Sequence, residues 1–312
     1  MKKIVTLTTN PAVDMNSRTN FVTDETKLSC KEPLYNPGGG GINVSRAIKI
    51  LGGESTAIYP SGGHTGRLLE SLLEQENINQ IPINIQEATR INFSIIEEKT
   101  NKQYRFNMPG AKINNKESET IIEKIQSIDP SPDYLVISGS LAPGLPDNFP
   151  RKIAKICRDI NCKMIIDTSP RAFRKAIEGG VFLIKPNLRE FLEISGIKLE
   201  SEEQIAKKAQ ELIYEGKTQV VIVSLGAAGS LFVTKDYFEH ICSPITPIKS
   251  RVGAGDSMVG GFTLKLAEGK DLKEAIYYGV ASGAAAVMTP GTELCRKEDT
   301  DRLFKIVKKE QE

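Results

Sequence analysis

Residues 134–167 read YLVISGSLAPGLPDNFPRKIAKICRDINCKMIID, a stretch that begins and ends with an apolar run. The runs Tyr134–Ser138 and Met164–Asp167 have the length and the β-branched content of buried strands. Between them, Ile153–Ile160 has apolar residues at helical spacing. A strand, a helix and a second strand in this order are typical of a parallel sheet, and strands that are apolar throughout indicate helices on both faces.

The same alternation extends along most of the chain. Further strands are predicted at Lys3–Thr8, Thr56–Tyr59, Phe182–Ile184 and Val220–Ser224. Further helices are predicted at Ile42–Leu51, Arg67–Glu76, Ser118–Ser127 and Glu202–Tyr214, and residues 256–309 are rich in helix. The predicted fold class is therefore α/β, with a central, mostly parallel sheet between two layers of helices.

Two segments break this rhythm, residues 13–35 and 89–108. Residues 89–108 read TRINFSIIEEKTNKQYRFNM, which predicts a hairpin of two alternating strands around Glu98–Asn101. Together the two segments could form a small sheet that projects as a lid, and the alternative is an edge extension of the main sheet. Because no linker rich in Pro, Gly or Ser divides the chain, we expect residues 1–312 to form a single domain.

Composition excludes several classes of function. The 41 basic and 39 acidic residues give a net charge of +2 without a basic stripe, which disfavours nucleic-acid binding. No apolar run reaches the ~18 residues that a membrane span needs. The five cysteines form no CxxC pair, so we expect reduced thiols and a cytoplasmic protein. The two histidines, His64 and His240, lie in no triad or zinc-ligand context, which disfavours histidine-based chemistry.

The strongest local motif is Val252-Gly253-Ala254-Gly255-Asp256-Ser257, at the start of a predicted helix. Glycines at the start of a helix let several N–H groups point at one spot, and the helix dipole adds positive potential there, so the motif predicts an anion site. Asp256 beside such an anion could accept a proton from an incoming hydroxyl. The alternative is that Asp256 only caps its own helix.

Three other polar motifs follow predicted strands or open predicted helices: Gly38–Val44, Lys185-Pro186-Asn187 with Glu190, and Ser224–Gly229. Ligands of α/β sheets bind beyond the carboxyl ends of the strands, although each motif could also be a simple turn or cap. Neither glycine cluster is a dinucleotide fingerprint, because Asn43 and Met258 stand where its third glycine belongs. Gly216-Lys217-Thr218 is no P-loop, because Glu211 replaces the glycine of that motif.

Taken in this order, the motifs resemble those of the ribokinase-like (PfkB-type) carbohydrate kinases, from Ile4 to about Asp299. Within that family the chain is similar to the minor-type bacterial 6-phosphofructokinases. Gly40 supports this, because 1-phosphofructokinases and tagatose-6-phosphate kinases commonly have Lys at the third glycine. The runs Gln103–Phe106, Met108–Ala111 and Val223–Gly226 also match the subgroup.

The resemblance implies roles for individual residues. Asp256 would be the base, and Gly253, Ala254 and Gly255 would bind the transferring phosphoryl group. The sugar would be held by Asp14, Gly38, Gly39 and Asn43, and its phosphate by Arg90 and Ser140. ATP would be bound by Lys185, Asn187, Ser224, Leu225, Gly226, Gly229 and Gly283.

The resemblance also implies ions and regulation. Glu190 would organise Mg²⁺ through water, and a K⁺ ion would lie near Ser250, Val252, Ala286 and Gly291. Lys27 matches a position that is tied to nucleotide-dependent regulation.

The expected reaction is ATP-dependent phosphorylation of fructose 6-phosphate to fructose 1,6-bisphosphate. The lid is expected to pair two subunits into a homodimer. The alternatives are another phosphosugar acceptor (fructose 1-phosphate or tagatose 6-phosphate), a nucleoside acceptor, and a sugar-phosphate sensor without activity. Asp256 disfavours the sensor, because a sensor needs no base.

Overall fold

A nine-stranded sheet runs through the centre of the structure, a computed structural model that describes residues 1–196 and 201–311. The strands lie in the order β13-β12-β11-β10-β9-β8-β1-β4-β5. Neighbours from β11 to β5 are parallel, whereas β12 and β13 add an antiparallel edge. The strands are β1 (Ile4–Leu7), β4 (Thr56–Ser61), β5 (Asn79–Asn84), β8 (Tyr134–Ser138), β9 (Lys163–Asp167), β10 (Val181–Ile184), β11 (Thr218–Ser224), β12 (Ser230–Val233) and β13 (Phe238–Ile241).

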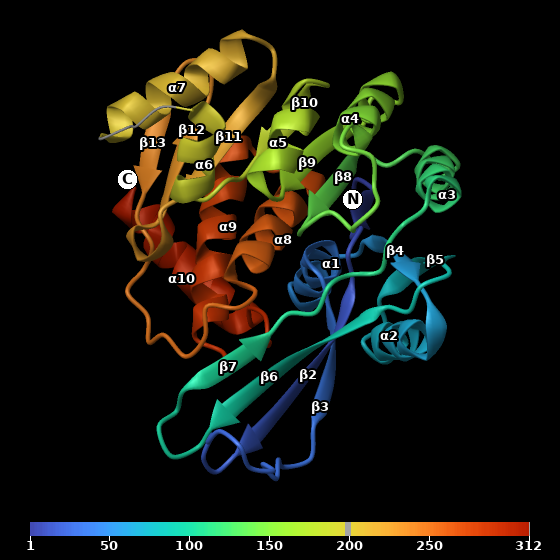
Figure 1. Ribbon diagram of the computed structural model, residues 1–312. Coiled ribbons are helices and arrows are strands. Elements are labelled where there is room, and N and C mark those ends of the chain that lie inside the picture. The colour runs from blue at the N-terminus through green and yellow to red at the C-terminus, as the bar shows by residue number, and fades with distance from the viewer. Residues whose placement is uncertain (197–200, 312) are drawn as a thin grey trace.

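Helices cover both faces of this sheet (Figure 1). One face packs against α1 (Gly40–Ile50), α2 (Gly63–Gln75), α8 (Ala254–Ala267), α9 (Leu272–Val287) and α10 (Lys297–Glu310). The other packs against α3 (Asn115–Gln126), α4 (Phe149–Asp159), α5 (Pro170–Ile177), α6 (Leu188–Ser195) and α7 (Glu202–Tyr214). None of the helices in the described residues is both long enough and apolar enough to cross a membrane.

The strands are apolar because both of their faces are buried. Ile4, Val136 and Ile165 point into the core beneath α1 and α8, and their neighbours Val5 and Ile137 point into the opposite core. Successive side chains of a strand alternate between faces, so strands between two helical layers need apolar residues at every position. The predicted α/β class is confirmed, and each predicted strand overlaps an observed one.

A second, four-stranded sheet stands apart from the first and projects from one end of the body (Figure 1). Its order is β3 (Leu34–Gly38), β2 (Ala12–Thr19), β6 (Arg90–Glu97) and β7 (Gln103–Phe106). The β6–β7 pair is the predicted antiparallel hairpin. Because no strand of this sheet pairs with the nine-stranded sheet, the alternative of an edge extension is wrong.

The register of the small sheet gives it two different faces. Met15 lies opposite Tyr35 and Phe93, and Phe93 lies opposite Phe106, so these side chains share one face. We call Met15, Tyr35, Phe93 and Phe106 the apolar face of the small sheet. Phe106 is 51% exposed and Tyr35 is 41% exposed. The other face carries Asp14, Asn16 and Asn92. Asn16 donates at 3.3 Å to Thr292 Oγ1, which lies in the loop between α9 and α10. This polar face therefore lies toward the main body.

Candidate active site

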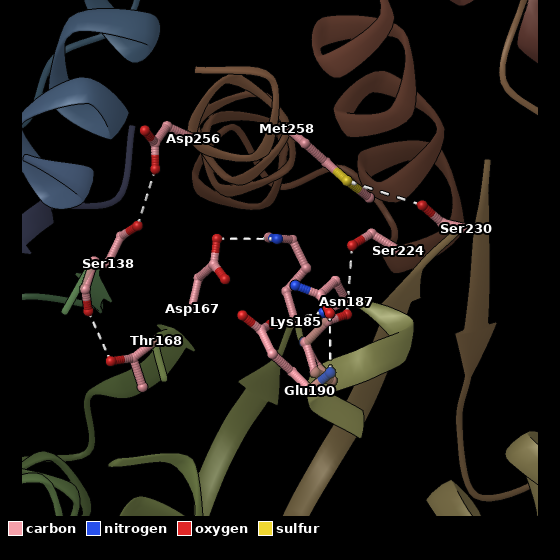
Figure 2. Close-up of polar contacts among 12 residues, drawn as sticks. Ser138, Asp167, Thr168, Lys185, Asn187, Glu190, Ser224, Ser230, Asp256 and Met258 are labelled. Atoms are coloured by element: carbon pink, nitrogen blue, oxygen red, sulfur yellow. Dashed lines mark hydrogen bonds and ion pairs between the residues drawn. The ribbon is translucent and has the colours of Figure 1, made fainter. Parts of the chain in front are cut away.

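Four strands of the main sheet end at a common edge and place polar side chains there. Ser138 ends β8, Asp167 ends β9, Lys185 directly follows β10 and Ser224 ends β11. The strands are parallel, so their carboxyl ends lie together, beside the first turn of α8 (Figure 2). This edge is where open α/β sheets bind their ligands.

Asp256 lies in the first turn of α8, and two side chains donate to its carboxylate. Asn43 Nδ2 is 3.0 Å from Oδ2, and Ser138 Oγ is 3.1 Å from Oδ1. Burial raises the pKa of Asp256 to about 6, the charge of Asp167 adds to that effect, and the two hydrogen bonds oppose it. The carboxylate can therefore accept a proton near neutral pH.

The first turn of α8 offers N–H groups to an anion. Gly253 precedes the helix in the left-handed conformation, with a φ of 75°. Among the residues that the structure describes, no atom accepts from the N–H groups of Ala254, Gly255 or Asp256. Free N–H groups at a helix N-terminus attract negative charge. The predicted helix start and its free donors are therefore present.

A buried ion pair lies next to this turn. Lys185 Nζ is 2.9 Å from Asp167 Oδ2, and the two side chains point toward each other (Figure 2). The helix start lies beside this pair, since a Cβ atom on Gly255 would be in ordinary contact with Lys185 Nζ, at 3.6 Å. The lysine charge adds to the positive potential of the helix end.

The glycines around the start of α1 are packed closely against neighbouring residues. A Cβ atom on Gly38 would lie 2.5 Å from Asp14 Oδ2, and one on Gly40 would lie 2.5 Å from the backbone nitrogen of Gly139. Gly39 has a φ of 112°, which favours glycine. Asn92 Nδ2 donates to Asp14 Oδ1 at 2.9 Å. Asp14 and the glycines thus meet at the start of α1, the helix that also carries Asn43.

Arg90 is held by backbone carbonyls of two loops. Its guanidinium donates to Asn10 O at 2.9 Å, to Met108 O at 3.0 Å and to Pro11 O at 3.3 Å. Burial lowers the pKa of Arg90, and the carboxylate of Asp14 opposes that shift. Asn10 Nδ2 in turn donates to Ser140 Oγ at 3.0 Å. Asn10 therefore connects the two residues that were assigned to a sugar phosphate.

The residues assigned to ATP lie around the end of β11. Asn187 and Glu190 form a capping box at the start of α6, with reciprocal backbone bonds of 2.9 Å. Ser224 N donates to Pro186 O, and Leu225 N donates to Gly229 O, which closes the glycine turn. A Cβ atom on Gly283 of α9 would lie 3.2 Å from Ala254 O, so this glycine allows α9 to pack against the start of α8.

The acidic residues near this edge suit a cation that is bound through water. Burial raises the pKa of Glu190, and the nearby charge of Asp167 raises it further, against the hydrogen bond from Asn187 N. No group of three or more His, Cys, Asp or Glu side chains with metal-ligand geometry occurs in residues 1–196 and 201–311. Mg²⁺ usually keeps several waters and takes one or two carboxylates, which fits Glu190 and Asp167.

Two of the residues assigned to K⁺, Ser250 and Gly291, are in hydrogen-bond contact with each other. Ser250 Oγ donates to Gly291 O at 2.8 Å and accepts from Val252 N at 3.2 Å. Thr289 Oγ1 lies 2.7 Å from Ala286 O. These hydroxyl and carbonyl groups are an all-oxygen set, which is the donor type of hard cations.

Lys27 lies apart from these groups, on the exposed loop between β2 and β3.

Several residues near the site were not identified from the sequence: Ser138, Asp167, Asn10 and Arg46. Ser138 and Asp167 carry the same signal as Lys185, a polar residue at the end of a buried strand. Arg46, which donates to Asn43 Oδ1 at 3.4 Å, carries no such signal.

Comparisons with known proteins agree on one family. The model of the pfkB family of carbohydrate kinases matches residues 4–299. The chain is 41% identical to ATP-dependent 6-phosphofructokinase isozyme 2 of Escherichia coli, over 97% of this chain and 98% of that protein. It is 33% identical to 1-phosphofructokinase of Bacillus subtilis, over 98% of each chain.

Solved structures show the same fold. The crystal structure of E. coli phosphofructokinase-2 in complex with potassium matches with a TM-score of 0.95 and 40% identity, over 99% of this chain and 100% of that one. The tetrameric inhibited form of that enzyme matches with a TM-score of 0.93 and 39% identity, over 99% and 100% of the two chains.

The environment of Asp256 leads to a testable titration. We expect its carboxylate to titrate near pH 6, followed by the ¹³C NMR shift of the labelled side chain. Asp167→Asn removes a neighbouring negative charge and should lower this pKa, whereas Lys185→Met removes a positive charge and should raise it. A midpoint near pH 4 in the unchanged protein, or shifts of the opposite sign in the variants, would contradict this account of the site.

Proposed function

The chain belongs to the pfkB family of carbohydrate kinases, and from this we propose that it transfers the terminal phosphoryl group of ATP to the 1-hydroxyl of fructose 6-phosphate. Its family and its named relatives indicate that the chain is a sugar-phosphate kinase, an enzyme that transfers a phosphoryl group to a hydroxyl group. The choice of acceptor is supported by the relative named 6-phosphofructokinase, which is 41% identical, against 33% for the one named 1-phosphofructokinase.

The observation that carries the proposal is the half-buried carboxylate of Asp256 beside free helical N–H groups. A sugar hydroxyl keeps its proton at neutral pH and is a poor nucleophile. Asp256, with its pKa near 6, would accept that proton as the new O–P bond forms. The N–H groups of Ala254 and Gly255 would stabilise the negative charge of the phosphoryl oxygens.

Arg90 supports a phosphorylated acceptor. A guanidinium has five N–H donors, and three of those of Arg90 are bound to carbonyls, which leaves two. The three bonds fix the orientation of the plane, so the two free donors would meet a phosphate without further ordering. Ser140 Oγ, which accepts from Asn10, would donate its own proton to the same phosphate.

Gly40 supports the 6-phosphate acceptor over a 1-phosphate. A Cβ atom at this position would lie 2.5 Å from both the Gly139 nitrogen and Ser138 Oγ. The lysine that other phosphosugar kinases have here would therefore require a shift of the backbone. The backbone around Ser138 suits glycine, and Ser138 itself donates to Asp256.

ATP would lie along the end of β11, between the glycine turn at Gly226–Gly229 and Lys185. Mg²⁺ would be held through water by Glu190 and Asp167, and when bound it neutralises phosphate charge. K⁺ would be held by the oxygens of Ser250 and of the carbonyls of Val252, Ala286 and Gly291.

We also propose that Lys27, an exposed cation, takes part in regulation by nucleotide. The protein would act in the cytoplasm, where its five free cysteines stay reduced.

The small sheet would act as the lid of a single kinase domain. Its polar face carries Asp14 and already touches the main body through Asn16 and Thr292. Closure over the sugar would exclude water, which would otherwise accept the phosphoryl group. The apolar face would bury itself against the same face of a second subunit, since exposed apolar patches mark interfaces.

Replacement of the base is the sharpest test. We expect Asp256→Asn to lower kcat by about two orders of magnitude, because the amide cannot accept a proton, with little change in either KM. Asp271→Asn is the matched control: Asp271 caps α9 away from the site through Glu274 N, and its variant should keep full activity. If Asp256→Asn keeps more than about a tenth of kcat, Asp256 is only a helix-capping residue.

The acceptor is tested with a coupled assay over a panel of sugars. Fructose 6-phosphate should give the highest kcat/KM, and free fructose should lose several kcal/mol of binding free energy because two donors of Arg90 are left without a partner. Arg90→Ala should raise KM for the sugar phosphate and leave KM for ATP unchanged, while the control Arg67→Ala on the exposed side of α2 changes neither. A tenfold preference for fructose 1-phosphate or tagatose 6-phosphate would refute the proposed acceptor.

Assembly is tested by sedimentation. We expect a dimer or a larger species, and Phe93→Asp should shift it toward the monomer with loss of activity, because a charge cannot be buried on the apolar face. Tyr214→Asp, at a 66% exposed position on α7, serves as the control and should leave the assembly unchanged. A fully active monomer would show that the apolar face needs no second subunit.

A further inference from the structure

Arg46 is a buried arginine that contacts Asn43, the residue that donates to the candidate base, without contacting the base itself. It lies on α1, three residues after Asn43, and is 7% exposed. Residues three apart on a helix lie on the same face, so Arg46 follows Asn43 toward the same neighbours. The roles assigned so far do not explain why an arginine is buried at this place.

The guanidinium of Arg46 makes three kinds of contact. Its Nε and Nη2 atoms donate to the two carboxylate oxygens of Glu76, at the end of α2, at 2.6 and 2.7 Å. Its Nη1 atom donates to Pro37 O at 3.3 Å and to Asn43 Oδ1 at 3.4 Å. The bidentate pair with Glu76 fixes the plane of the guanidinium, and this plane directs Nη1 at Asn43.

The contact determines which end of the Asn43 amide faces Asp256. Arginine has only donors, so the group that it meets on Asn43 must be the oxygen. The amide nitrogen then points the other way and donates to Asp256 Oδ2 at 3.0 Å. In the flipped orientation the amide oxygen would face the carboxylate and the amide NH₂ would face the guanidinium, so both contacts would be repulsive.

We propose that Arg46, held by Glu76, is a positioning residue that keeps the Asn43 amide nitrogen on Asp256 and thereby keeps the base ready to accept a proton. The proposal rests on the proposed function of Asp256. A carboxylate that loses a donor becomes easier to protonate, and an amide oxygen opposite it favours the protonated acid. The other charges that act on Asp256, those of Asp167 and Lys185, lie on β9 and after β10 and are independent of α1.

The test compares Arg46→Met with Glu76→Gln. Arg46→Met keeps the aliphatic part of the side chain and removes its donors, so the acid limb of the kcat/KM profile should move up by about half a pH unit or more. At pH 6 kcat/KM should therefore fall about twofold, and at pH 7 it should change little, with KM for ATP unchanged. Glu76→Gln keeps one acceptor but loses the bidentate pair that orients the guanidinium, so it should move the acid limb in the same direction by a smaller amount.

Controls separate positioning from a purely structural role. Arg151→Met breaks a more exposed arginine–glutamate pair far from Asn43, with Glu178 at 3.4 Å between α4 and the end of α5, and should leave the pH profile unchanged. If Arg46→Met lowers the melting temperature but leaves the acid limb where it is in the unchanged protein, the proposal is wrong. If Arg46→Met fails to fold, Arg46→Lys can replace it in the test. Lysine keeps the charge but lacks the planar guanidinium, so the acid limb should move in the same direction by a smaller amount.

A second readout keeps the proposal separate from the proposed function. The ¹³C titration of Asp256 reports its protonation whether or not it acts as a base, and Arg46→Met should raise the midpoint by the same half unit. If the midpoint moves but Asp256→Asn stays active, the positioning holds and the role of the base fails. If Asp256→Asn is inactive and the midpoint does not move, only the positioning fails.

Discussion

The close approach of α1 to the ends of β1 and β8 is the contact on which the rest of the site depends. Ile42 N donates to Thr8 Oγ1 at 2.7 Å, and a Cβ atom on Gly41 would lie 2.6 Å from the same oxygen. Only glycine allows this distance. The approach brings Asn43 to Asp256 and Arg46 to the end of β3, so a short run of residues without side chains places two polar side chains of the candidate site.

The site also illustrates how a protein keeps a carboxylate available in a poorly hydrated place. A buried carboxylate without donors would become protonated, because charge is costly in a low dielectric. With too many donors or cations it would be a weak base. Asp256 lies between these two extremes. It accepts hydrogen bonds from Asn43 and Ser138, and the opposite charges of the nearby Asp167–Lys185 ion pair act on its pKa in opposite directions.

Much of the architecture could be predicted from the sequence, because strands buried on both faces have an unmistakable apolar pattern. The prediction missed β5, with Pro82 and three polar residues, the edge strands β12 and β13, and the eight-residue helices α5 and α6. Contacts between residues that are distant in the sequence could not be predicted: Asn43 and Asp256, for example, are 213 residues apart. Arg46 looks like a residue on a solvated helix face until α2 is packed over it, since its burial is a property of tertiary structure.

The order of the helices along the chain has a consequence for biosynthesis. The sheet face that contains Ile4, Val136 and Leu183 is covered largely by α8, α9 and α10, which lie between residues 254 and 310. The opposite face is covered by α3 to α7, which are synthesised earlier. A growing chain thus displays a broad apolar surface until its last helices leave the ribosome, which makes chaperone binding most valuable at that late stage of translation.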